Sequence, residues 1–76
     1  MQTITLEQFK AIRSVYHLTQ AEMAALLSVH ESLINHIENG RRNISARVGR
    51  ILIDEFELTA EKLQRILQIH KEFSVR

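Results

Sequence analysis

Apolar residues recur along most of this chain at intervals of three and four positions, the spacing that lines one face of an α-helix. Five stretches show the pattern, at residues 6–16, 20–27, 31–39, 46–57 and 60–73. Gly occurs only twice and Pro does not occur, so few residues interrupt helices. The pattern therefore predicts an all-α protein of five helices, which we expect to pack as a single domain over residues 1–76.

Polar residues that commonly begin helices stand directly before these stretches. Hydroxyl side chains are expected to cap four of the helices, at Thr5, Thr19, Ser45 and Thr59. Gln8 and Glu22 follow the first two threonines at the third position, which is the spacing of a capping box. The cap of the 31–39 helix would be His30, an unusual residue there. Gly40 is placed to end that helix in a left-handed conformation.

The last predicted helix, within residues 59–73, has more apolar positions than one face can hold. Leu63, Leu67 and His70 share one face, and a neighbouring face carries Ile66, Ile69 and Phe73. A domain of this size needs only one of the two faces for its own core. We therefore predict that the second face, with Ile66, Ile69 and Phe73, contacts a second copy of the chain.

Length and composition limit the classes of function. The chain has 76 residues, 45% hydrophobic and 25% charged, which allows one globular domain with one small core. Cysteine is absent, so disulfides and thiolate metal sites are excluded. Four histidines lack the spacing of metal ligands: His17, His30, His36 and His70. With no nucleophile–base arrangement either, we expect no enzymatic activity, no cofactor and no metal.

The N-terminal segment has neither the basic region nor the long apolar run of a signal peptide. No apolar stretch approaches the roughly 18 residues that a membrane span needs. We therefore expect a cytoplasmic protein with no membrane partner.

The net charge of +1 says little about partners, but the distribution of charge says more. Between residues 40 and 50 there are four arginines and no acidic residue: Arg41, Arg42, Arg47 and Arg50. A local cluster of this kind suits nucleic-acid phosphates, even in a chain that is nearly neutral overall. The alternative is a solvated face without a ligand.

Residues 19–40 hold two short helical patterns separated by a break at residues 28–30. Apolar residues would hold the two helices together: Met23, Ala24, Leu27, Val29, Leu33, Ile34 and Ile37. Polar residues of the second helix would face outward: Glu31, Ser32, Asn35 and His36. This arrangement is typical of a helix-turn-helix, whose second helix reads base edges in the DNA major groove.

Nine positions of this segment resemble the Cro/CI-type (XRE) helix-turn-helix pattern in residue type and register. They are Gln20, Met23, Ala24, Leu27, Val29, Ile34, Ile37, Glu38 and Gly40. The resemblance implies a lambda-repressor-like five-helix domain that binds double-stranded DNA. The chain departs from the pattern at Ser28, in place of a turn glycine, and at His30 and Glu31. Because the turn position often requires a positive φ, we expect either strain at Ser28 or a reshaped turn.

The resemblance maps the family's base-reading positions onto Glu31, Ser32, Asn35 and His36. Asn35 could pair with adenine, and Glu31 could accept from cytosine N4. Phosphate contacts are expected from the start of the first helix of the pair and from residues after the second: Gln20, Asn39, Arg41, Arg42, Asn43 and Arg47. For each of these residues the alternative is a solvated surface side chain.

Arg13 is a cation on the apolar face of the first predicted helix. Its stem could pack against apolar neighbours while its guanidinium reaches water. Alternatively it pairs with a carboxylate, and Glu38 is the candidate, because Arg13 and Glu38 match a structural pair in many members of the family. Such a pair would join the first helix to the end of the third and take no part in base reading.

The resemblance implies a sequence-specific transcriptional regulator, which we expect to be a repressor that binds a palindromic operator as a homodimer. Two-fold pairing would set the two recognition helices, residues 31–39, about 34 Å apart, one turn of DNA. The alternative is a protein-interaction module of the same fold, an antirepressor, modulator or antitoxin that binds a partner repressor or toxin. Glu31 and the surplus apolar surface within residues 59–73 favour that alternative. A DNA-bound form would be associated with the nucleoid.

Overall fold

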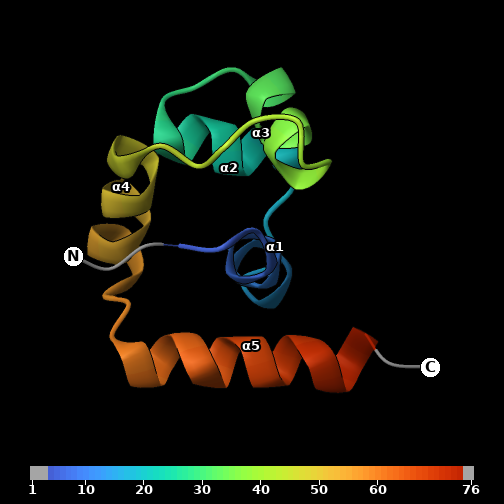
Figure 1. The fold of residues 1–76 in the computed structure, drawn as a ribbon, viewed down its shortest axis with the longest axis vertical. Helices are drawn as coiled ribbons and strands as arrows, with labels where there is room; N and C mark the ends of the chain where they lie inside the picture. The colour runs from blue at the N-terminus through green and yellow to red at the C-terminus, as the bar shows by residue number, and fades with distance from the viewer. Residues whose placement is uncertain (1–3, 75–76) are drawn as a thin grey trace.

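The computed structural model describes residues 4–74, which form five α-helices (Figure 1). They are α1 (Leu6–Val15), α2 (Gln20–Leu27), α3 (Glu31–Glu38), α4 (Ala46–Phe56) and α5 (Ala60–Ser74). No strand occurs between residues 4 and 74, so the predicted all-α class with five helices is confirmed. None of the helices in this part of the chain is long and apolar enough to cross a membrane.

Hydroxyl side chains cap the starts of four of the helices, as the sequence predicts. Thr5 and Thr19 both form complete capping boxes. The Thr5 hydroxyl accepts from the Gln8 backbone N–H at 3.1 Å, and Gln8 Oε1 accepts from the Thr5 N–H at 3.0 Å. Ser45 and Thr59 accept from backbone N–H groups three residues further on, at 3.2 and 3.1 Å. Each helix therefore starts at the residue that the sequence indicates.

Four helices end through a residue in the left-handed conformation. These residues are His17, Ser28, Gly40 and Glu57, with φ between 51° and 76°. In each case the following residue donates its backbone N–H to the carbonyl five positions earlier, at 2.8–3.0 Å. Ser28 thus adopts the positive φ that a glycine usually supplies in the family, and the turn keeps its shape with some local strain.

α1 lies at the centre of the molecule. Figure 1 shows it nearly end-on, with α5 running beneath it and with α2 and α3 above it. α1 contacts α5 and α3, while α2 contacts α3 and α4. The largest fully buried side chains come from the first four helices: Phe9, Ile12, Met23, Leu27, Ile34, Ile37 and Leu52. The α2–α3 pair is therefore held in place by α1 and α4.

The structure buries one of the three residues that the sequence predicts for the contact face of α5. Ile66 is only 4% exposed and lies in the core together with Leu63, so it offers little surface to a second copy. α1 covers the strip of α5 that lies between the two predicted faces. Leu63 of one face and Ile66 of the other are therefore both buried. Ile69 is partly exposed and Phe73 is 77% exposed, so these two residues remain accessible to a second copy.

Candidate nucleic-acid interface

The start of α3 is capped by a histidine. The Ser32 backbone N–H donates to His30 Nδ1 at 3.1 Å, and the Ser32 hydroxyl oxygen lies 3.0 Å from the same nitrogen. The imidazole therefore caps α3 in the way that a serine or threonine hydroxyl usually does.

The two faces of α3 differ in burial. Ile34 and Ile37 are at most 1% exposed and hold the helix on the core. The opposite side carries all four predicted base-reading residues, which are exposed or, for the last, partly exposed: Glu31, Ser32, Asn35 and His36. This face combines a carboxylate, a hydroxyl, an amide and an imidazole, so it offers both donors and acceptors to base edges.

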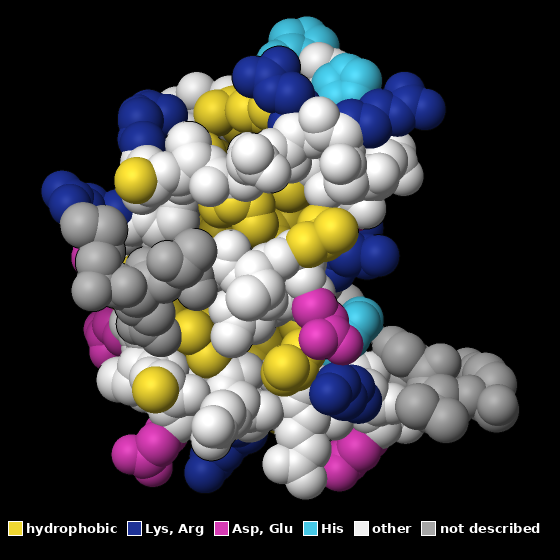
Figure 2. All heavy atoms as spheres, in the orientation of Figure 1, with side chains coloured by type: hydrophobic (Ala, Val, Ile, Leu, Met, Phe, Trp, Pro, Cys, Tyr) yellow, Lys and Arg dark blue, Asp and Glu magenta, His cyan; other side chains and the backbone are white. Residues whose placement is uncertain are grey.

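Cationic residues follow α3 directly. Arg41, Arg42 and Asn43 are exposed in the loop after α3, and Arg47 is exposed in the first turn of α4. Figure 2 shows that His and several Lys or Arg side chains gather at the upper end of the molecule, over α2 and α3. On this face the acidic side chains lie in the lower half. Positive charge is thus concentrated beside α3, as contact with phosphates requires.

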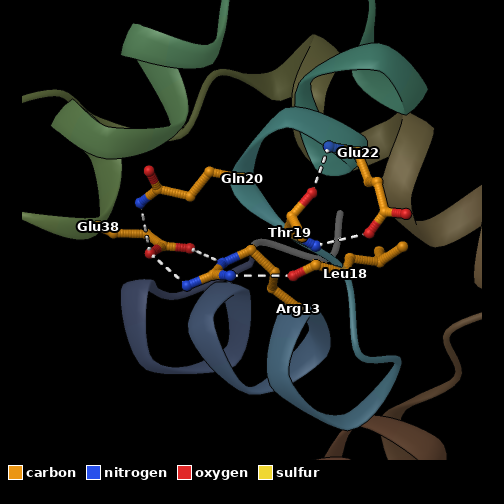
Figure 3. A network of polar contacts seen from close by, with 6 residues as sticks. All are labelled: Arg13, Leu18, Thr19, Gln20, Glu22 and Glu38. Carbon is orange, nitrogen blue, oxygen red and sulfur yellow. Dashed lines mark hydrogen bonds and ion pairs between the residues drawn. The ribbon is translucent and has the colours of Figure 1, made fainter.

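A polar network joins α1, α2 and α3 (Figure 3). Arg13 Nε and Nη2 donate to the two carboxylate oxygens of Glu38 at 2.5 and 3.0 Å. Arg13 Nη1 donates to the Leu18 carbonyl at 2.9 Å. The side chains of Arg13 and Glu38 are 29% and 10% exposed. The predicted pair is therefore present, and it fixes the end of α3 against α1.

Gln20, the first residue of α2, belongs to the same network. Its Nε2 donates to Glu38 Oε1 at 3.2 Å (Figure 3). Gln20 is predicted from the sequence to contact phosphate, and the structure shows that one of its two amide protons is used inside the protein. The second proton remains for a ligand. The bond spans 18 residues of sequence, so no local spacing indicates it.

Asn39, which is also predicted to contact phosphate, has a partner on its own helix. Its Nδ2 donates to Asn35 Oδ1 at 2.9 Å, and its backbone N–H donates to the Asn35 carbonyl at 3.0 Å. The side-chain bond was not predicted from the sequence, although side chains four residues apart meet on a helix. The structure thus brings a predicted base reader and a predicted phosphate ligand into direct contact.

These features define a class of protein, a five-helix domain that presents one short polar helix beside a cationic loop, as DNA-binding helix-turn-helix domains do. A family model described as helix-turn-helix matches residues 9–63, well over half of the chain. The chain therefore belongs to the XRE family of helix-turn-helix proteins, and its fold is lambda-repressor-like. It is a DNA-binding helix-turn-helix regulator. Comparisons with curated proteins and with solved structures return no match.

Proposed function

We propose that the protein is a transcriptional repressor that binds a palindromic operator as a homodimer, with α3 in the major groove. The observation that carries the proposal is the outward face of α3, where Glu31, Ser32 and Asn35 are exposed. A helix in the major groove reads bases with side chains on this face and at its N-terminal end. A bound dimer occupies promoter DNA, and this occupation alone suffices for repression.

The four outward side chains of α3 match different base edges. The Asn35 amide offers the acceptor and the donor that fit adenine N6 and N7, and the Glu31 carboxylate accepts from cytosine N4. Ser32 suits several bases, and His36 donates to guanine or to a phosphate. A good bidentate contact contributes about 1–3 kcal/mol of discrimination between bases, so Asn35 carries the largest share of the proposed specificity.

The proposed phosphate contacts surround α3. Arg41, Arg42, Asn43 and Arg47 are exposed on the loop and on the first turn of α4. Gln20 adds its remaining amide proton at the start of α2, where unpaired backbone N–H groups also favour an anion. Because the arginines displace counterions from DNA, binding should weaken as the salt concentration rises.

The proposed dimer contact lies between α5 and the end of α1. A groove of about 230 Å³ is lined by Ser14, Val15, His17, Ile69, His70 and Phe73. Phe73 is 77% exposed, so one surface carries both a protruding aromatic ring and a groove. Two copies related by a two-fold axis can therefore fill each other's groove.

The proposal can be tested by selection of binding sites from randomised duplex DNA, followed by binding titrations at several salt concentrations. We expect two-fold symmetric sites to be enriched. Arg42→Ala should weaken binding to selected and unselected DNA alike and lower the slope of log K against log salt by about 1. Lys10→Ala, which removes an exposed cation of α1 away from the cluster, should leave the slope unchanged. Binding that does not weaken with salt would contradict the proposed phosphate contacts.

A protein-interaction module is the second candidate, and the 77% exposure of Phe73 favours it. In that case the chain would be an antirepressor, modulator or antitoxin that binds a partner repressor or toxin. Asn35→Ala and Arg42→Ala would leave its biological effect unchanged. Phe73→Asp would abolish the effect even when dimerisation of the chain itself is shown to be unnecessary. A DNA-reading repressor should instead lose operator binding with each of the first two substitutions.

A further inference from the structure

Two hydrogen bonds join Asn35 and Asn39. The Asn39 side chain donates from Nδ2 to Asn35 Oδ1 at 2.9 Å, and the Asn39 backbone N–H donates to the Asn35 carbonyl at 3.0 Å. The backbone of Asn39 is held further by the turn that follows, because Gly40 has φ 76° and the Arg41 N–H donates to the His36 carbonyl at 2.8 Å. The Asn39 side chain therefore extends from a fixed point of the backbone beside the Asn35 amide.

The bond restricts how the Asn35 amide can be turned. An asparagine amide has two oxygen lone pairs and two N–H donors, and rotation by half a turn exchanges their positions. If both amides turn together, the bond persists with Asn35 as the donor, so the bond holds the plane and position of the Asn35 amide in either orientation. In each orientation at least one lone pair and at least one N–H of Asn35 remain. Adenine requires this combination, one acceptor for N6–H and one donor for N7.

We propose that Asn39 is a positioning residue for Asn35: it orients the Asn35 amide for adenine and contributes to base selectivity without touching a base. The inference rests on the proposed function, since it needs α3 to lie in the major groove. It replaces the phosphate contact that the sequence predicts for Asn39. The two roles differ in consequence, because a phosphate ligand strengthens binding to every sequence whereas a positioning residue acts only through Asn35.

A double-mutant cycle separates the two roles. The probes are the duplex that wild-type protein enriches from a random pool and variants of it with each adenine replaced in turn. We expect Asn35→Ala to lower selectivity for one adenine roughly ten-fold. Asn39→Ala should lower selectivity for the same adenine about two-fold in each half-site, as expected for a hydrogen bond between neutral side chains one turn apart. In the Asn35→Ala background, Asn39→Ala should have no further effect on that ratio.

Asn39→Asp is the matched control variant. It keeps the size of the side chain and can accept from an N–H of Asn35, so it should retain most of the adenine selectivity that Asn39→Ala loses. Its added charge weakens binding to all duplexes alike and therefore cancels in the selectivity ratio. Circular dichroism of each variant without DNA verifies that the helices are retained.

The outcomes distinguish this inference from the proposed function. If wild-type protein enriches no sequence, the proposed function fails, and the role of Asn39 fails with it. If a site is enriched but Asn39→Ala weakens binding to every duplex equally, and does so also in the Asn35→Ala background, only the positioning role is overturned. Coupling between the two substitutions, confined to one adenine, supports it.

Discussion

Glu38 shows how one side chain can serve three elements. It belongs to α3, and its carboxylate accepts hydrogen bonds from Arg13 of α1 and from Gln20 of α2. A carboxylate that is 10% exposed has lost most of its hydration, so these protein donors take the place of water. Glu38 therefore positions both the end of α3 and the side chain at the start of α2, although it takes no part in the proposed base reading.

Replacing Glu38 by alanine should destabilise the fold. The substitution leaves the Arg13 guanidinium without its charge partner in a site that is largely closed to water. We expect the free energy of unfolding to fall by about 2–3 kcal/mol, less than for a fully buried pair because Arg13 retains some contact with solvent. Urea unfolding followed by circular dichroism measures the change. Glu38→Gln, which keeps an acceptor, should lose less, and no loss in either variant would contradict the role assigned to the network.

At the scale of elements, α4 contains a glycine that its backbone does not require. Gly49 is buried inside the helix, and a Cβ added there would meet Ile4 Cγ1 at 3.7 Å, an ordinary contact distance. Gly40, at the end of α3, is the opposite case: its surroundings are open, but its φ of 76° disfavours any side chain. Conformation therefore limits substitution at Gly40, whereas neither conformation nor space limits a substitution to alanine at Gly49.

Alanine substitution should therefore change stability in opposite directions at the two glycines. Gly49→Ala should raise the free energy of unfolding by about 1 kcal/mol, because alanine is the better helix former and its methyl group fits. Gly40→Ala should lower it by about 1 kcal/mol, because alanine must adopt the left-handed conformation. Thermal unfolding of the two variants provides the comparison. A lower Tm for Gly49→Ala would contradict the inference that a methyl group fits beside Ile4 without strain.

The starts of the helices could be predicted because each cap involves residues only two or three positions apart, as for Thr5 with Gln8. The register of Ser28 in the family pattern left strain and a reshaped turn as alternatives, and its positive φ corresponds to the first. The burial of Ile66 could not be predicted, since it depends on where α1 meets α5, which involves contacts far apart in sequence. In the candidate interface, spacing was enough to place the outward residues of α3. The bond from Gln20 to Glu38 depends on tertiary packing of two helices, and no pattern along the chain reveals it.

At the scale of the whole molecule, the proposed DNA-reading and dimer surfaces are separated by the core. α3 lies above α1 and α5 lies beneath it in Figure 1. α1 contacts both helices, so a change on the outer side of α5 reaches α3 only through a well-packed layer. Pairing and base reading can therefore be altered independently by substitution.

Phe73→Asp should separate dimer formation from folding. Phe73 is 77% exposed, so its loss should leave the helices and the Tm nearly unchanged. A charge at the proposed contact should shift the protein to a monomer in sedimentation experiments. Affinity for a two-fold symmetric site should fall, because each half-site must then be occupied separately. Gln64→Asp places the same charge at another exposed position of α5 and should leave the dimer intact. Dimers that persist in Phe73→Asp would contradict the assigned surface.

The left-handed helix ends also have a consequence for the unfolded chain. His17, Ser28 and Glu57 adopt positive φ without being glycine, which costs about 1–2 kcal/mol each in the folded state. A residue with a side chain samples fewer backbone conformations than glycine when unfolded, which returns roughly 0.4–1 kcal/mol by lowering the entropy lost on folding. The second effect offsets about half of the first. The unfolded ensemble of this chain, which has only two glycines, is narrower than that of a glycine-rich equivalent. Four helices can therefore end in the left-handed conformation although only one of the four residues is glycine.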